Sequence, residues 1–183
     1  FLGMGFISSA AHHIAELPIL QEAIQSIKAN PYQSLLISML FCALVQSSAV
    51  TVGLVMTLVH AQILTLHDAM FWVYGANIGT TSIALIAAIG SNHIGRQVAW
   101  AHFFYKTLSV AIFLVGSVHE YFVSFLGTLS DTASRQIANG HLIFNLISAA
   151  VFFPFIKPAS AFIEKLFPKD PKEDFTAKYL AMN

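Results

Sequence analysis

Residues 32–66 form a run of 35 residues without any Asp, Glu, Lys or Arg. A helix that spans a bilayer needs about 20 apolar residues, so this run is too long for one span and too short for two spans with a turn. The polar sequence Gln-Ser-Ser interrupts the run at residues 46–48, where a lipid-facing helix is normally most apolar. The run therefore predicts a re-entrant hairpin, in which two half-length helices meet at a polar break that is buried in protein.

The composition of the whole chain supports a membrane protein. Of the 183 residues, 56% are hydrophobic and 10% are charged, whereas a soluble domain has roughly 25% charged residues. Nine basic side chains balance nine acidic ones, so the chain lacks the basic surface that nucleic-acid binding requires, and we expect no nucleic-acid partner. We expect an all-α polytopic protein in a lipid bilayer.

A second polar interruption follows in residues 69–90, which are long and apolar enough for a span. Its centre reads Gly-Ala-Asn-Ile-Gly-Thr-Thr at residues 75–81. Glycine weakens a helix, and Asn and Thr offer side-chain oxygens at the break. Interrupted segments of this kind point to the binding site of a transporter. The alternative is close helix packing through small residues, which explains the glycines but explains Gln46 and Asn77 less well, so we favour a transport site.

The remaining charge and proline pattern divides the chain into five parts. We expect the end of an upstream membrane helix plus an interfacial amphipathic helix (1–31), the re-entrant hairpin (32–66), a broken span (67–92), two further spans with an interfacial connection (93–156) and a tail (157–183). Five lysines lie in the tail, and because positive charge is enriched on the cytoplasmic side, we expect a cytoplasmic C-terminus.

Two segments of the chain are similar to each other. Residues 96–106 read RQVAWAHFFYK and residues 135–145 read RQIANGHLIFN. Chance similarity between apolar helices is one explanation, and we favour the other, a shared ancestry or a shared packing role. Each copy carries a His with a polar residue four positions later, on the same helix face. The intramembrane polar contacts expected from this pattern involve His102, Lys106, His141 and Asn145, and we favour a hydrogen-bonded packing contact between the two spans.

Enzymatic and transition-metal motifs are not found in the sequence. Neither serine of residues 47–48 lies in a G-x-S-x-G motif, the nucleophile motif of α/β-hydrolases, and nothing in the sequence ties these serines to a His and an Asp. The eight histidines form no H-x-x-H, H-x-x-x-H or H-E-x-x-H motif. We therefore expect no enzyme, no cofactor and no metal other than sodium.

The two interruptions resemble the paired motifs of the type II sodium–phosphate cotransporter family. In that family, Q-S-S-S and G-A-N-I-G-T-T mark each of two inverted repeats. The order of segments and the tail make this chain similar to the C-terminal repeat of a bacterial member. The resemblance implies a secondary active transporter of the bacterial inner membrane, with several spans, which couples the symport of inorganic phosphate to sodium by alternating access.

The resemblance also implies roles for individual residues. Ser47 and Ser48 would contact phosphate. The residues that would coordinate sodium, or tie the hairpin to the broken helix, are Gln46, Thr51, Asn77, Thr80 and Thr81. Ala49 stands where the family has its third serine, so one hydroxyl is missing from the motif.

One motif set is half of a site in this family, so the resemblance implies that a second repeat completes it. Either the other half lies in a missing N-terminal part of the polypeptide, or a second copy of this chain assembles as an inverted partner, and we favour the first. The resemblance further implies a PhoU-like regulatory domain as a partner. The alternative functions are transport of another small oxyanion, or a structural or sensor membrane subunit without transport.

Overall fold

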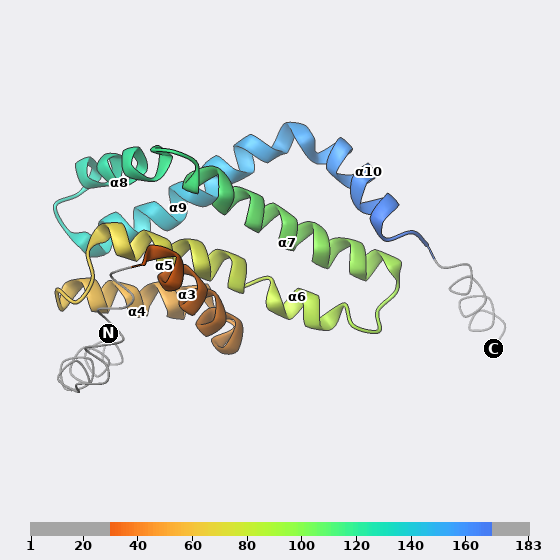
Figure 1. Ribbon diagram of the computed structural model, residues 1–183, viewed down its shortest axis with the longest axis horizontal. Coiled ribbons are helices and arrows are strands. Elements are labelled where there is room, and N and C mark those ends of the chain that lie inside the picture. The colour runs from red at the N-terminus through yellow and green to blue at the C-terminus, as the bar shows by residue number, and fades with distance from the viewer. Residues whose placement is uncertain (1–29, 170–183) are drawn as a thin grey trace.

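The computed structural model describes residues 30–169, and all regular elements in this part are helices (Figure 1). These elements are α3 (Pro31–Val45), α4 (Ser48–His60), α5 (Leu66–Gly79), α6 (Ser82–Ala87), α7 (His93–Leu114), α8 (Val118–Leu129), α9 (Ala133–Phe152), the 3-10 turn η1 (Phe153–Phe155) and α10 (Ile156–Leu166). The expected all-α class is confirmed for this part. The helices expected before residue 30, and the tail beyond residue 169, lie outside the described residues.

Within residues 30–169, two helical segments are long and apolar enough to cross a membrane. They are Leu66–Ala87, with 22 residues, and Ala133–Leu166, with 34 residues. The pair α7 and α8 becomes a third candidate if it is counted as one span with an 85° bend. The helices α3 and α4 are apolar but have 15 and 13 residues, which is shorter than the roughly 20 residues of a full span.

The helical segment that contains α9 and α10 continues past residue 156, where we expected the tail to begin. At 1.5 Å per residue its 34 residues are longer than the roughly 30 Å hydrocarbon core of a bilayer. A bilayer of that thickness therefore leaves part of the segment outside the hydrocarbon. In the most apolar stretch of 18 residues in this segment, only 11% is buried inside the protein. Most of the apolar side chains in that stretch can therefore face lipid or another protein surface.

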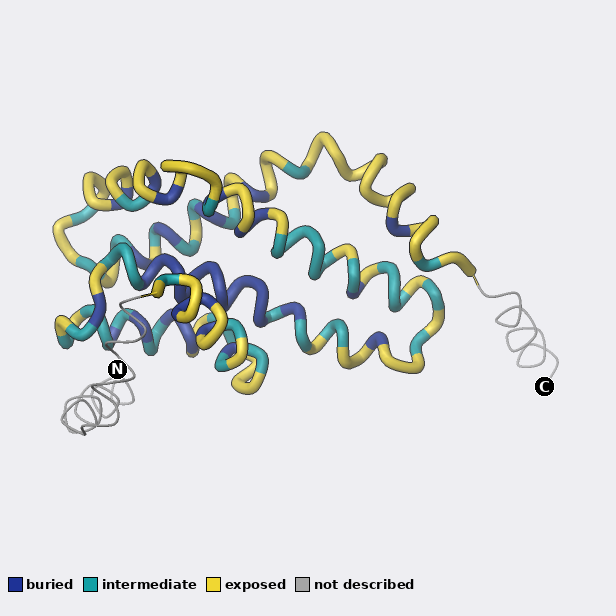
Figure 2. Tube along the Cα trace, in the orientation of Figure 1, coloured by how far each residue is buried: buried dark blue, intermediate teal, exposed yellow. Residues whose placement is uncertain are grey.

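Helix α5 is the centre of the fold. All of its residues from Ala69 to Gly79 are buried, and it contacts α3, α4, α7, α8 and α9. Figure 2 shows this contrast, with buried residues concentrated along α5 and exposed residues along α8 and α10. A helix that is apolar on all sides is stable only when other helices surround it, and this is the position that α5 takes.

The contact of α3 with α5 is close because two glycines face it. A Cβ atom at Gly75 would overlap the carbonyl oxygen of Leu35, and one at Gly79 would lie 2.5 Å from the carbonyl oxygen of Met39. Residues four apart lie on one face of a helix, so the two glycines together let the backbones approach. Close approach through small residues is a standard way to pack helices in membranes.

Polar side chains of α3 complete this contact. The hydroxyl of Ser38 donates a hydrogen bond to the carbonyl oxygen of Trp72 at 2.6 Å, and the thiol of Cys42 donates to that of Ala76 at 3.3 Å. Both donors are fully buried. A buried polar group is stable only when it is hydrogen-bonded, so these contacts fix how α3 sits on the helix that carries the second motif.

Candidate functional site

The first break separates α3 from α4 at Gln46 and Ser47. Gln46 adopts the left-handed backbone conformation, with φ 60° and ψ 24°, and its N–H donates to the carbonyl oxygen of Cys42 at 2.7 Å. The hydroxyl oxygen of Ser47 then accepts a hydrogen bond from the N–H of Val50 at 3.3 Å and caps the next helix. The chain thus ends one helix and starts another within two residues, as the polar sequence predicted.

The side chains at this break differ in how accessible they are. Gln46 is exposed, Ser47 and Ser48 are half-buried, and Thr51 is fully buried. The hydroxyl of Thr51 donates to the carbonyl oxygen of Ser47 at 3.0 Å. Thr51 therefore holds the turn in place, while the two serines lie at the accessible N-terminus of a 13-residue helix. Helix N-termini present N–H donors and a partial positive charge, which favour anions.

The second break is confined to Thr80 and Thr81, between α5 and α6. Both keep right-handed backbone angles, and their hydroxyls donate at 2.7 Å to the carbonyl oxygens of Asn77 and Ile78, respectively. The interruption that the sequence predicted across residues 75–81 is thus two residues long, and Gly75 to Gly79 are helical. The physical reason is tertiary packing, because close contact with α3 outweighs the low helix propensity of glycine.

Three side chains from three helices meet beside the second break. The ammonium group of Lys106, on α7, donates to Oδ1 of Asn77 at 3.0 Å and to Oδ1 of Asn145, on α9, at 2.6 Å. The Nδ2 group of each asparagine donates a hydrogen bond to the carbonyl oxygen four residues earlier in its own helix. Asn77 donates to Val73 at 2.9 Å, and Asn145 donates to His141 at 2.8 Å. Both amide oxygens are therefore directed to the ammonium group. We call Asn77, Lys106 and Asn145 the lysine bridge.

The ammonium group of the lysine bridge has no carboxylate partner in the part of the chain that the structure describes. Within residues 30–169, the ion pairs found involve His67 with Asp68 and with Glu120, and none involves Lys106. Asn77 is 2% exposed, so the ammonium group binds a buried amide oxygen. Charged residues inside membrane segments are costly and usually functional. The bridge therefore places a positive charge beside the motif that carries Asn77.

The structure brings some of the predicted residues together and leaves others apart. Lys106 and Asn145, at matching positions of the two similar segments, are hydrogen-bonded. No side-chain hydrogen bond of His102 or His141 is found within the described residues. No hydrogen bond within residues 30–169 joins a side chain of the first break to one of the second, and the two breaks are linked through the packing of α3 on α5.

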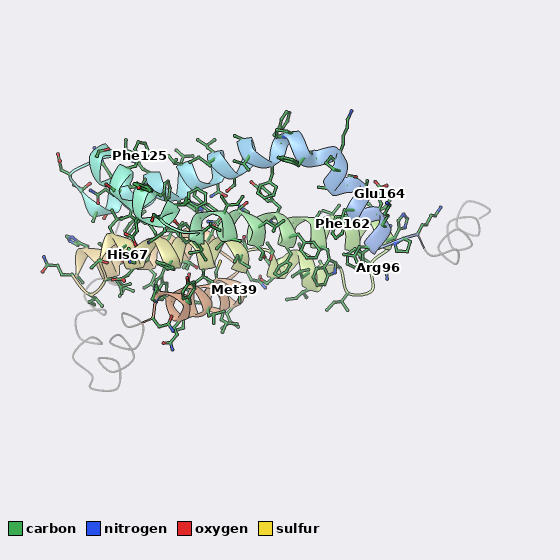
Figure 3. All side chains as sticks on the ribbon, turned by 45° about the horizontal axis from the view of Figure 1, so that its top comes forward. Met39, His67, Arg96, Phe125, Phe162 and Glu164 are labelled. Carbon is green, nitrogen blue, oxygen red and sulfur yellow. The ribbon has the colours of Figure 1, made fainter. Side chains whose placement is uncertain are left out.

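The cavity found among the described residues lies away from the predicted site residues. A cavity of about 600 Å³ lies between α7 and α10, and its apolar wall includes Phe104, Tyr105 and Phe162. None of the residues of the two breaks or of the lysine bridge lines it. Figure 3 shows Arg96, Phe162 and Glu164 at this end of the molecule, away from His67 at the other end.

The chain is similar in sequence to several known proteins. The chain is 30% identical over 178 residues to the uncharacterized protein YqeW of Bacillus subtilis, covering 92% of this chain and 56% of that protein. It is 25% identical over 173 residues to the putative inorganic phosphate export protein YjbB of Escherichia coli K12, covering 94% of this chain and 32% of that protein.

A human relative extends the comparison. The sodium-dependent phosphate transport protein 2B of Homo sapiens is 34% identical over 110 residues, covering 57% of this chain and 16% of that protein. No solved structure matches the chain. The chain thus spans between about a sixth and about half of the length of these three relatives. The model of the Na+/Pi-cotransporter family matches residues 1–152, and the chain therefore belongs to this family of phosphate transporters.

Proposed function

We propose that this chain supplies one half of a site for the sodium-coupled symport of inorganic phosphate by alternating access. Family membership supports phosphate as the substrate, and the name of the human relative supports sodium as the coupling ion. The observation that carries the proposal is the lysine bridge, because a positive charge with no carboxylate partner among the described residues is hydrogen-bonded to Asn77, the central polar residue of the second motif. A fixed positive charge in a membrane segment attracts an anion.

Phosphate binds at the first break in this proposal. Ser47 and Ser48 are half-buried and stand at the N-terminus of α4, so their hydroxyls and the free N–H groups of the first turn are available as donors. Phosphate at a helix N-terminus is stabilised by these donors and by the helix dipole. Ala49 is exposed and offers no hydroxyl, so two serines, rather than three, contribute side-chain donors.

Sodium binds to neutral oxygens near the two breaks. The proposed ligands are drawn from Gln46, Thr51, Asn77, Thr80 and Thr81. Amide, hydroxyl and carbonyl oxygens suit a weakly held monovalent cation, and freed carbonyls at broken helices are used this way in transporters. Oδ1 of Asn77 already accepts from Lys106, so sodium at Asn77 would share that oxygen with the ammonium group or replace it.

The site is complete only with a second set of motifs. We propose that it comes from a second repeat, in the same polypeptide or in an inverted second copy, and that a PhoU-like domain regulates transport. The many exposed apolar side chains of α3, α7 and α9 provide the surface that lipid and a second repeat would cover. We place the protein in the bacterial inner membrane, with several spans and a cytoplasmic C-terminus.

Net export is a second candidate, favoured by the name of the Escherichia coli relative. A coupled transporter moves its substrate in the direction that the sum of the gradients favours, so the same site serves import or export. The two candidates differ only in the gradient that drives net phosphate movement in the cell.

The experiment is radiolabelled phosphate flux in proteoliposomes that contain the purified protein. We expect uptake when a sodium gradient points inward, and none when choline replaces sodium. Equal phosphate flux in sodium and in choline would show that the protein transports phosphate without coupling it to sodium. Sulfate or arsenate flux that exceeds phosphate flux would favour another oxyanion, and no flux of any of these anions would favour a structural or sensor subunit.

A further inference from the structure

Two imidazoles and a carboxylate meet where α5 and α8 begin, away from both breaks. His67 is the second residue of α5, and His119 and Glu120 are the second and third residues of α8. One nitrogen of each imidazole and one oxygen of Glu120 lie within 4.8 Å of one another. Imidazole nitrogens and carboxylate oxygens are common ligands of zinc and related divalent metals. Figure 3 shows His67 at the end of the molecule where α8 lies.

His119 supplies an observation that points to a ligand. The residue is 5% exposed, and its Nδ1 atom lies 3.2 Å from the hydroxyl oxygen of Tyr74. Its other nitrogen, Nε2, is buried and has no hydrogen-bond partner within the described residues. An unsatisfied buried polar atom costs about 1–3 kcal/mol, and native proteins rarely retain one without a reason such as a bound ion. A metal ion on Nε2 would remove this cost.

The other two residues are reachable from water. The side chains of His67 and Glu120 are 38% and 66% exposed, and Nε2 of His67 lies 3.1 Å from Oε1 of Glu120. The rings of His67 and His119 are 4.5 Å apart, centre to centre, and nearly perpendicular at 80°. A metal ion can therefore reach the cluster from the exposed side and bind the buried nitrogen without crossing the helix core.

Surrounding groups hold the two imidazoles in place. The Tyr74 hydroxyl contacts His119, and Oδ1 of Asp68 lies 3.9 Å from Nδ1 of His67. Asp68 is itself fixed, because its Oδ2 atom accepts from both the N–H and the hydroxyl of Thr65. The ring of Phe71 covers both imidazoles. Outer groups of this kind orient metal ligands and shield them from water.

We propose that His67, His119 and Glu120 bind one divalent transition-metal ion, for which Zn²⁺ is the probe, and that this ion links α5 to α8. Two histidines and one carboxylate form a three-ligand set that zinc uses in proteins, and it leaves the fourth position to water. The proposal does not rest on phosphate transport, because none of the residues assigned to phosphate or sodium takes part. Its failure and the failure of the proposed function are therefore distinguishable.

The test is isothermal titration of Zn²⁺ into the purified, chelator-treated protein in detergent. We expect one ion per chain. His67→Gln and Glu120→Gln should each weaken binding by about 100-fold or more, because changes to outer groups alone cost roughly 10–100-fold. Both positions are partly exposed, so these variants should fold. His60→Gln is the matched control, because His60 is an exposed histidine at the end of α4 and its loss should leave binding unchanged.

A third variant probes the outer contact. Tyr74→Phe keeps the ring and removes the hydroxyl that contacts His119, so it should weaken Zn²⁺ binding by about tenfold. Visible absorption of Co²⁺ bound in place of Zn²⁺ should show the intense bands of a tetrahedral site and lose them in His67→Gln. Wild-type affinity in both His67→Gln and Glu120→Gln, or an equal loss in His60→Gln, would overturn the proposal.

Discussion

The two helix breaks in this chain look alike in the sequence and differ in the structure. At the first break the backbone turns sharply through the left-handed Gln46, and Ser47 and Ser48 stay half-buried. At the second break Thr80 and Thr81 keep helical angles, and both hydroxyls are bonded to the preceding turn. One break leaves its hydroxyls at an accessible helix start, whereas the other satisfies them within its own helix.

We infer different tasks for the two motifs from this difference. In the proposed function the first break supplies donors for an anion, whereas the second motif packs α5 against α3. Within the second motif, Gly75 and Gly79 pack against α3, and Asn77 binds Lys106. The small residues of that motif therefore serve helix packing, and its asparagine serves hydrogen bonding. Substitutions at the two kinds of position should have different effects.

The largest effect should come from the packing role of the second motif. Gly75→Val places a branched side chain against the backbone of Leu35, so α3 and α5 must separate. Overpacking usually costs 1–3 kcal/mol, and a backbone clash should cost at least about 3 kcal/mol in unfolding free energy. Denaturation monitored by tryptophan fluorescence in detergent measures this.

The control for that prediction is Gly53→Ala, in α4, because no atom lies within 4 Å of a Cβ built there. Its stability should stay unchanged or rise by up to about 1 kcal/mol, because alanine favours a helix more than glycine does. If Gly75→Val were as stable as Gly53→Ala, the packing role of the second motif would be wrong.

The next effect concerns the lysine bridge. Lys106→Met keeps much of the side-chain volume and removes the charge, so phosphate flux should fall by about 10–100-fold, as expected when a charged hydrogen bond worth about 1.5–3 kcal/mol is lost. Flux in proteoliposomes is the measurement, with protein amount matched. The control is Lys157→Met, at an exposed position of α10. Equal flux in the two variants would show that Lys106 takes no part in phosphate transport.

A smaller effect should follow at the first break. Ser47→Ala removes the cap of α4, whose hydroxyl oxygen accepts from the N–H of Val50, and loss of such a cap costs about 1 kcal/mol. Thermal unfolding in detergent should show a slightly lower midpoint. Ser47→Asp retains a capping oxygen and should restore the midpoint. A midpoint that does not respond to either change would mean that the cap contributes nothing to this break.

An effect of similar size to that of Ser47→Ala should come from Cys42. Its thiol donates a weak hydrogen bond to Ala76, so Cys42→Ala should lower the free energy of unfolding by about 1 kcal/mol through lost packing and this bond. Cys42→Ser supplies a stronger donor of similar size and should come closer to wild type. If Cys42→Ser lowered the free energy of unfolding much more than Cys42→Ala does, the sulfur would stabilise the protein through packing alone.

Much of the fold follows from local sequence. The charge-free run with its central Gln-Ser-Ser predicted two short helices that meet at residues 46–48, and they do. The extent of the second interruption was overestimated, because residue propensity does not reveal that Gly75 faces the backbone of α3. The similarity of residues 96–106 and 135–145 pointed to matching faces of two helices, and Lys106 and Asn145 lie in contact there.

Contacts between distant segments could not be predicted from spacing. Asn77 joins the pair of Lys106 and Asn145 from a third helix, and no periodicity relates its position to theirs. The same limit applies to His67 and His119, which are 52 residues apart and fall outside any metal-binding motif. Only the fold, with α5 surrounded by its neighbours, brings such residues together.

The proposed function requires that the first break binds phosphate. Equilibrium binding of radiolabelled phosphate to the purified protein, in sodium, tests it without the complication of turnover. We predict that Ser48→Ala weakens binding by about tenfold, as expected for the loss of one hydrogen bond to a charged group. Ser124→Ala, at an exposed position of α8, should bind like the wild type. Wild-type phosphate affinity in Ser48→Ala would contradict phosphate binding at the first break.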